Sequence, residues 1–181
     1  AAAVMHVGWN ALAKRGRHPL CFLWSAQATA LVLLGPLAAG VLVGEGFAAP
    51  ALPFVVATIL LHGVYFYALG RSYAAGAFSL VYPIARGLGV ALVPVLALVV
   101  FDERLSPLGA TGVGLVIAGI VVLQLGTAGW GRIAAQLRGA GAALGWPLLT
   151  GVTIAGYSLV DKAGVGRLHP VPYIALMGLG V

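Results

Sequence analysis

One arginine lies inside a long apolar stretch of this chain. Residues 79–107 read SLVYPIARGLGVALVPVLALVVFDERLSP, and Arg86 interrupts their apolar part. A guanidinium inside a hydrocarbon-length segment costs about 2.5–3.5 kcal/mol on insertion scales, so such residues usually face a protein interior or a watery cavity. The planar guanidinium can bind a carboxylate through two hydrogen bonds. Arg86 is therefore a candidate for contact with an anionic or carboxylate-bearing substrate. The alternative is that it binds backbone carbonyls and fastens a helix bundle.

Two hydroxyl-bearing residues precede this arginine at helical spacing. Tyr82 and Ser79 lie four and seven residues before Arg86, so the three share a similar helical face. We expect them to line the same cavity, with core packing as the alternative. Pro83 and Pro94 each remove a backbone donor and bend the helix, which frees carbonyls near the charge.

A second polar set lies in the apolar stretch before this one. His62 and Tyr65, three residues apart, share a helical face within residues 52–69. A membrane histidine can relay protons or hydrogen-bond a substrate, and it can equally be a satisfied interior side chain. His62 and Glu103 are the candidates for proton coupling, and Asp161, near the end of a later stretch, is a further acidic group. No second histidine or carboxylate stands at ligand spacing, so we predict no metal site.

Asn10 and Lys14 form a third candidate pair, on one helix face near the beginning of the chain. Lys14 would either line the mouth of a cavity or extend to the lipid headgroups. In an intramembrane enzyme, Ser79 could act as the nucleophile and His62 as its base. The sequence has no Gly-x-Ser-x-Gly motif around the serine to support this interpretation. We therefore predict no catalytic residue and no cofactor.

The composition requires these residues to be positioned by membrane helices. The 181 residues are 61% hydrophobic and 8% charged, with a mean hydropathy of +1.06, whereas ordinary globular domains carry about 25% charged residues. A bilayer core demands roughly 20 apolar residues per helix. Runs without Asp, Glu, Lys or Arg cover residues 18–44, 46–70, 105–131 and 139–160. The sequence predicts an all-α, polytopic helical membrane protein.

Charge and cysteine content limit the partners. The net charge of +6 is scattered over short connections, whereas nucleic-acid binding would need a clustered basic face. We predict no nucleic-acid partner and contact with the lipid bilayer. The single cysteine, Cys21, excludes an intrachain disulfide.

The pattern of apolar runs and turn residues predicts seven spans, the first and last of them incomplete. Arg71 is expected in a tight loop after the third span. Ser106-Pro107 predicts a helix start, with serine as cap and proline in the first position. Residues 126–141 predict a link with a short helix on the membrane surface. The predicted spans are residues 1–13, 20–43, 52–69, 77–101, 107–125, 142–160 and a seventh beginning near Pro170.

An internal repeat is visible in two places. Residues 9–16 (WNALAKRG) align with residues 157–164 (YSLVDKAG), and His18-Pro19 aligns with His169-Pro170 three residues later in the second copy. Five helices separate the copies, so the second enters the membrane from the opposite side. Inverted repeats that meet at the bilayer midplane are typical of secondary transporters.

Three segments of the chain resemble one transporter family. WNALAKRG, ALGRSYAAGAFSLVYPIAR and DERLSPLGATGVGLVIAGIVVL are similar to the EamA branch of the drug/metabolite transporter superfamily. The resemblance implies a parent with ten helices in two inverted five-helix halves, which exports or exchanges small metabolites, amino acids or drugs. Asn10, Lys14, Ser79, Tyr82, Pro83, Arg86 and residues 103–107 match its pattern. Asp102 departs from the pattern, because the family more often has glycine there, and the departure bears on the tightness of that turn.

These observations together predict a fragment of a secondary transporter. Residues 1–125 would form the first five-helix repeat, residues 126–141 the link and residues 142–181 the start of the second repeat. We expect a small-molecule substrate, export by alternating access, and a multi-pass location in a bacterial-type inner (plasma) membrane, with a homodimer left open. The alternatives are an intramembrane enzyme and a structural membrane subunit without transport.

Overall fold

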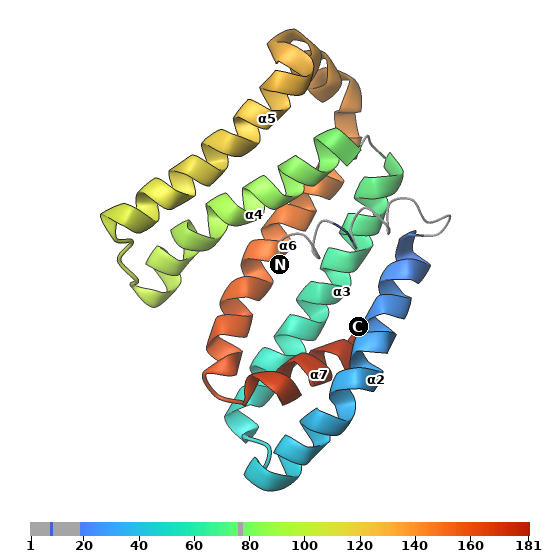
Figure 1. Cartoon of the computed structure of the whole chain (residues 1–181), viewed down its shortest axis with the longest axis vertical. Coiled ribbons are helices and arrows are strands. Elements are labelled where there is room, and N and C mark those ends of the chain that lie inside the picture. Colours follow the sequence, from blue (N-terminus) through green and yellow to red (C-terminus); the bar gives the residue numbers. More distant parts are fainter. Residues whose placement is uncertain (1–7, 9–18, 76–77) are drawn as a thin grey trace. The chain divides into compact units, whose positions relative to one another are not determined.

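The computed structural model describes residue 8 and residues 19–75 and 78–181 (Figure 1). Among these residues every element is helical, and the connections between elements are short. In chain order the elements are α2 (Pro19–Glu45), the 3-10 helix η1 (Ala49–Ala51), α3 (Leu52–Ala75), α4 (Phe78–Phe101), α5 (Pro107–Ala140), the 3-10 helix η2 (Gly141–Leu144), α6 (Gly145–Val165) and α7 (Pro170–Gly180).

Three of the described helices are long and apolar enough to cross a membrane: Trp24–Glu45, Ala49–Ala74 and Val81–Phe101. Large apolar side chains on these and neighbouring helices stay outside the core. Val43 is 89% exposed, Val99 is 78% exposed and Leu108 is 84% exposed. Lipid covers such surfaces without cost, and helices satisfy their own backbone groups there. The prediction of an all-α polytopic membrane protein is confirmed.

The chain forms two compact units. Unit 1 consists of residues 1–70 and 160–181, and unit 2 consists of residues 71–159. The division cuts through α3 and α6, so each unit holds part of both helices. The predicted boundaries of the two repeats, at residues 125 and 142, stay a prediction.

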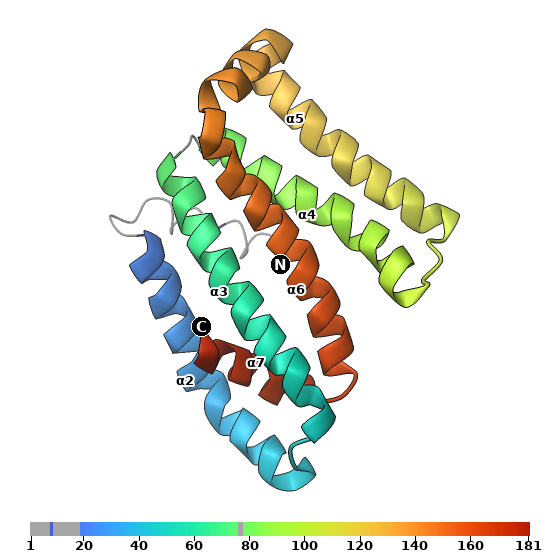
Figure 2. The ribbon, with the colours of Figure 1, turned by 180° about the vertical axis from the view of Figure 1, so that it is seen from behind.

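In unit 1, α7 packs against α2, and both helices lie beside α3 (Figures 1 and 2). Glycines on the last helix permit the close approach: a Cβ at Gly178 would lie 3.1 Å from Gln27 Nε2, and one at Gly180 would lie 2.5 Å from Ile59 Cδ1. The buried core cluster of this unit is Ala51, Val55, Leu168 and Tyr173.

The proline of each His-Pro pair in the predicted repeat is the first residue of a helix. α2 begins at Pro19 and α7 begins at Pro170. Proline suits the first helical position because its missing N–H would have no helical partner. At α7 the side chain of His169 also caps the helix, with Nδ1 accepting from the N–H of Val171 at 3.2 Å. The inverted relation between the two copies stays a prediction.

In unit 2, α4 runs antiparallel to α5 and packs on the first part of α6 (Figures 1 and 2). α4 contains both Pro83 and Pro94 and continues through them as one helix. The contact with α6 is so close that a Cβ at Gly151 would meet the Ala85 carbonyl oxygen at 2.9 Å. Small residues thus allow helix backbones to approach, as in other membrane bundles.

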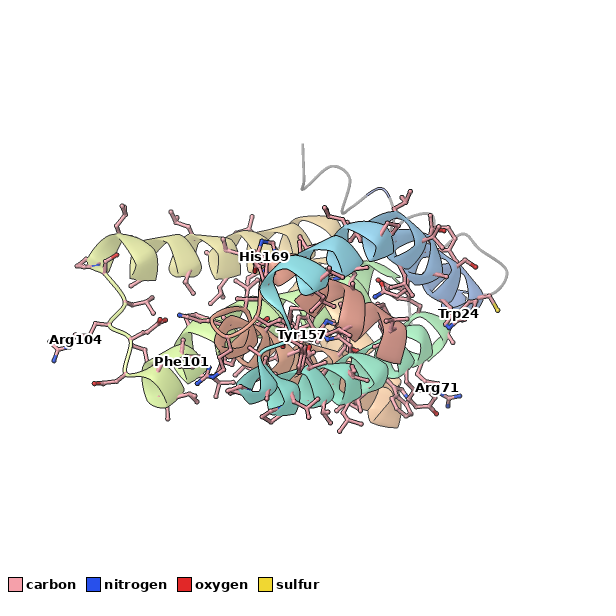
Figure 3. The ribbon with its side chains drawn as sticks, turned by 90° about the horizontal axis from the view of Figure 1, so that it is seen from below. Trp24, Arg71, Phe101, Arg104, Tyr157 and His169 are labelled. Atoms are coloured by element: carbon pink, nitrogen blue, oxygen red, sulfur yellow. The ribbon has the colours of Figure 1, made fainter. Side chains whose placement is uncertain are left out.

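The turn between α4 and α5 shows why the departure at residue 102 is tolerated. Asp102 follows the last residue of α4 with φ of 51°, a left-handed conformation that glycine adopts freely and that aspartate adopts more readily than most other residues. The helix start predicted at Ser106-Pro107 is confirmed, because the Ser106 hydroxyl accepts from the N–H of Gly109 at 3.1 Å and Pro107 is the first helical residue. Arg104 extends away from this turn (Figure 3).

One expected loop is helical, and the predicted link continues the helix before it. α3 continues to Ala75, so the prediction of a tight loop at Arg71 is wrong. The Arg71 guanidinium instead lies over the Trp146 ring, 5.2 Å from its centroid, and this contact favours the extra helical turn. Residues 126–140 continue α5 beyond a break at Gly129, whose φ of 67° is not helical. The link predicted at residues 126–141 is therefore largely helical.

Candidate transport site

The polar centre of unit 1 is the carboxylate of Asp161, near the end of α6. The Thr58 hydroxyl of α3 donates to Asp161 Oδ1 at 2.5 Å, and the Tyr173 hydroxyl of α7 donates to the same oxygen at 3.0 Å. Thr58 is fully buried and Tyr173 is 2% exposed. Two buried hydroxyls thus supply hydrogen bonds to one carboxylate oxygen, and hydrogen bonds to an ionised acceptor are the strong ones. Three helices therefore meet at one acidic group.

A histidine extends this cluster by one side chain. His62 Nδ1 lies 3.0 Å from Thr58 Oγ1 and 3.0 Å from the Thr58 carbonyl oxygen. A carbonyl can only accept, and the Thr58 hydroxyl hydrogen is already directed to Asp161, so Nδ1 carries a hydrogen in this arrangement. The donors run in one direction, from His62 through Thr58 to Asp161.

The spacing of these residues explains their meeting. Thr58 and His62 stand four residues apart in α3 and so share one face of that helix. Tyr173 reaches Asp161 because Gly164 leaves room for its ring. A Cβ at Gly164 would lie 2.6 Å from the tyrosine hydroxyl oxygen. The hydroxyl also donates to the Phe54 carbonyl at 3.3 Å, so Tyr173 joins α7 to two other helices.

A cavity of about 430 Å³ lies in the same unit. Three of its lining side chains are aromatic: Trp24 from α2, and Phe66 and Tyr67 from α3. Trp24 is 67% exposed and projects from α2 (Figure 3). The remaining lining residues are Cys21, Ser25, Gln27 and Val181. This volume lies in the range of about 300–1,000 Å³ typical of small-molecule sites, which combine apolar walls with a few polar groups.

Aromatic contacts join the cavity to the polar cluster. The ring centroids of His62 and Phe66 lie 6.4 Å apart, and those of His62 and Tyr65 lie 6.2 Å apart in an edge-to-face arrangement. Phe66 lines the cavity and His62 belongs to the cluster around Asp161. The predicted pair of His62 and Tyr65 is thus found together, next to a cavity.

The predicted pair of Tyr82 and Arg86 lies in unit 2. Both residues are half-buried on α4, and the guanidinium lies over the Tyr82 ring, 5.8 Å from its centroid. This distance corresponds to a cation–π contact between residues four apart on one helix. A direct contact of Arg86 with a substrate stays a prediction.

The other predicted residues have different outcomes. Ser79 belongs to α4, but its side chain is outside the described part of the structure. Asn10 and Lys14 lie outside the described residues altogether. Glu103 is exposed in the connection between α4 and α5, away from any helix interior. Within the described ranges no group of three or more His, Cys, Asp or Glu side chains is arranged to hold a metal ion.

Sequence reasoning missed Thr58 and Tyr173, and it named Asp161 only as a further acidic group. One signal was available: Thr58 precedes His62 by one helical turn, in the same way that Tyr82 precedes Arg86. Nothing in the sequence indicated that α7 would bring Tyr173 to Asp161. That contact spans two helices whose angle depends on the turn at residues 166–169.

Comparison with known proteins finds two curated relatives that are similar to parts of this chain. Neither a family model nor a solved structure matches it. The quaternary ammonium compound-resistance protein QacE of Escherichia coli is 33% identical over 81 residues, which are 45% of this chain and 72% of QacE. The chain belongs to the same family as QacE.

The multidrug transporter PA4990 of Pseudomonas aeruginosa is 47% identical over 47 residues, which are 26% of this chain. This match spans 43% of the PA4990 transporter, less than half of its length.

Proposed function

We propose that the protein is a secondary transporter that exports small drug-like molecules across a bacterial inner membrane by alternating access. In this proposal it has the two-halved, ten-helix arrangement of the EamA branch, of which this chain contributes the first half and the start of the second. The single observation that carries the function is the aromatic cavity of unit 1. It has the size of a small-molecule site, and its lining residue Phe66 lies beside His62 of the cluster around the half-buried carboxylate of Asp161.

The lining of this cavity favours an organic cation as substrate. The aromatic faces in the lining offer π-electron density, which attracts quaternary ammonium groups. An aromatic ring carries no net charge, so no charged protein side chain has to lose its water when the cation binds. These rings belong to Trp24, Phe66 and Tyr67. The negative charge of Asp161 in the same unit adds a favourable field for a cation. The relatives' names, a multidrug transporter and a quaternary ammonium compound-resistance protein, support the same substrate class.

The experiment is ethidium transport, because ethidium is a fluorescent quaternary aromatic cation. The full-length protein is reconstituted in liposomes, and ethidium movement is followed with and without an opposing substrate gradient. Trp24→Ala and Tyr67→Ala are expected to lower the rate at least tenfold, whereas Phe47→Ala, an exposed aromatic between α2 and α3, leaves it unchanged. Equal rates in all three variants would contradict the cavity as the substrate site.

Arg86 supports a second substrate class. A half-buried guanidinium on a membrane helix could receive a carboxylate, so a zwitterionic or acidic solute is the alternative cargo. Competition decides between them: a quaternary ammonium compound should inhibit ethidium transport, and an amino acid or an organic acid should not. Chemical analysis of the recovered solute separates transport from enzymatic turnover, since a transporter returns its solute unchanged.

A further inference from the structure

We propose that Asp161 is a proton-binding site, that protons reach it from His62 through the Thr58 hydroxyl, and that Tyr173 transmits its charge state to the packing of α7. The proposal rests on the proposed transport function in one respect only: that the cavity of unit 1 holds the solute. The proton site itself is argued from the hydrogen bonds of the described residues.

The hydrogen bonds form an unbroken path between two titratable groups. Nδ1 of His62, Oγ1 of Thr58 and Oδ1 of Asp161 follow one another at 3.0 Å and 2.5 Å. A hydroxyl both donates and accepts, so it can pass a proton along such a path without carrying a charge at rest. Membrane carboxylates and histidines arranged in this way are typical of proton relays.

In total, the transfer takes up one proton at His62 and delivers one proton to Asp161. A proton binds at Nε2 of the imidazole, the hydrogen on Nδ1 moves to Thr58 Oγ1, and the hydroxyl hydrogen of Thr58 moves to Asp161 Oδ1. The imidazole ends neutral with its hydrogen on Nε2, the hydroxyl is restored with its direction reversed, and the carboxylate becomes a neutral acid. Release by the same path in reverse restores the starting arrangement, so no other reactant is needed.

Tyr173 is placed to detect this change. Its hydroxyl has two acceptors, Asp161 Oδ1 at 3.0 Å and the Phe54 carbonyl at 3.3 Å. A hydrogen bond to an ionised carboxylate is roughly twice as strong as one to a neutral group. Protonation of Asp161 therefore removes the preference for the carboxylate and shifts the hydroxyl toward Phe54. Tyr173 is a positioning residue in this scheme, because it contacts neither the solute nor an incoming proton.

The shift can reach the cavity through α7. This helix packs against α2 at Gly178 and Gln27, and Gln27 also lines the cavity together with Val181, which follows α7. A change in how Tyr173 holds α7 thus acts on two lining residues. A small movement in a tightly packed contact tends to switch between discrete arrangements rather than deform gradually.

The contacts described for Asp161 and His62 bring in two more titratable side chains, Tyr65 of α3 and Tyr173 of α7, and α2 presents the neutral Gln27 to α7. Lys162 of α6 is exposed. Arg167 is exposed too, with its guanidinium over the Phe54 ring and donating to the Ala163 carbonyl.

The first test measures proton binding without transport. Infrared difference spectra of the purified full-length protein are recorded as the pH is lowered, and the carboxylic-acid band is compared with that of Asp161→Asn. We expect a band that appears in the unaltered protein and is missing in Asp161→Asn, together with a change in the tyrosine ring modes that Tyr173→Phe abolishes. Identical spectra for the unaltered protein and Asp161→Asn would overturn the proposal.

The second test separates the proton path from solute binding. Ethidium movement is measured in liposomes, once driven by a pH gradient and once by ethidium counterflow at equal pH. Thr58→Val should lower the gradient-driven rate at least tenfold and leave counterflow within twofold. Thr58→Ser should restore the gradient-driven rate. Thr153→Val is the matched control, since Thr153 is a buried threonine whose hydroxyl donates to carbonyls of its own helix.

The outcomes distinguish the two proposals. Full gradient-driven transport in both Thr58→Val and Asp161→Asn would overturn the proton path while leaving the transport function intact. If the unaltered protein shows no ethidium counterflow, the transport proposal is wrong. The infrared comparison would then still decide whether Asp161 binds a proton. If Thr58→Val fails to fold, the infrared comparison with Asp161→Asn still tests the proton site.

Discussion

Gly164 offers the sharpest test of the packing around Asp161. A Cβ at this position would lie 2.5 Å from Tyr173 Cζ and 2.6 Å from its hydroxyl oxygen, well inside van der Waals contact. Tyr173 is 2% exposed and packs in the core cluster of unit 1, so its ring has no free space to enter. We therefore expect Gly164→Ala to displace the ring and break its hydrogen bond to Asp161.

Two terms set the expected size of this effect. Overpacking of a tight core costs about 1–3 kcal/mol, and loss of a hydrogen bond to a charged group costs about 1.5–3 kcal/mol. We expect the free energy of unfolding to fall by about 3–5 kcal/mol. The measurement is an unfolding titration with a denaturing detergent in mixed micelles, on the full-length protein.

A matched glycine and a double variant make the test specific. Gly63 lies in α3 next to His62, and a Cβ there would have nothing within 4 Å, so Gly63→Ala should stabilise by up to about 1 kcal/mol. Tyr173→Ala combined with Gly164→Ala should be no less stable than Tyr173→Ala alone, because the clash partner is gone. If Gly164→Ala were as stable as Gly63→Ala, the packing argument and the position of Tyr173 would both be wrong.

Three further predictions concern unit 2. If the cargo carries a carboxylate, Arg86→Ala should abolish its transport in liposomes while the amount of protein in the membrane stays unchanged, and a fall in folded protein alone would show that Arg86 fastens the bundle. Asp102→Gly should raise the free energy of unfolding by up to about 1 kcal/mol, since φ of 51° suits glycine, whereas Ala118→Gly inside α5 should lower it by about 1 kcal/mol. Ser106→Ala should lower it by about 1 kcal/mol through loss of the cap at Gly109, and an unchanged unfolding titration would mean that water replaces the cap.

The helices could be predicted from the sequence because their signals are local. Long runs without charge, turn residues and the Ser106-Pro107 cap depend on neighbours a few residues apart, and the structure confirms them. Arg71 shows the limit of such signals. Its charge suggested a loop, but a stacking contact with Trp146, 75 residues away in the chain, favours a longer helix.

The candidate site was predicted in part for the same reason. His62 with Tyr65 and Tyr82 with Arg86 are pairs at three- and four-residue spacing within one helix, so periodicity alone brought each pair together. The partners of Asp161 come from other helices and could not be inferred in this way. The left-handed turn at Asp102 is an intermediate case, because the resemblance to a family with glycine there already indicated which residue would be unusual.

The sequence by itself determined that this chain is a bundle of membrane helices and which side chains share a helix face, because hydropathy and a period of 3.6 residues need no tertiary information. Only the tertiary structure decided that a carboxylate on α6, a threonine and a histidine on α3 and a tyrosine on α7 form one hydrogen-bonded group. The physical reason is that helix packing depends on where small residues such as Gly164 let rings and backbones approach. The hydrogen bond from Thr58 to Asp161 depends on that packing, and it joins residues 103 positions apart.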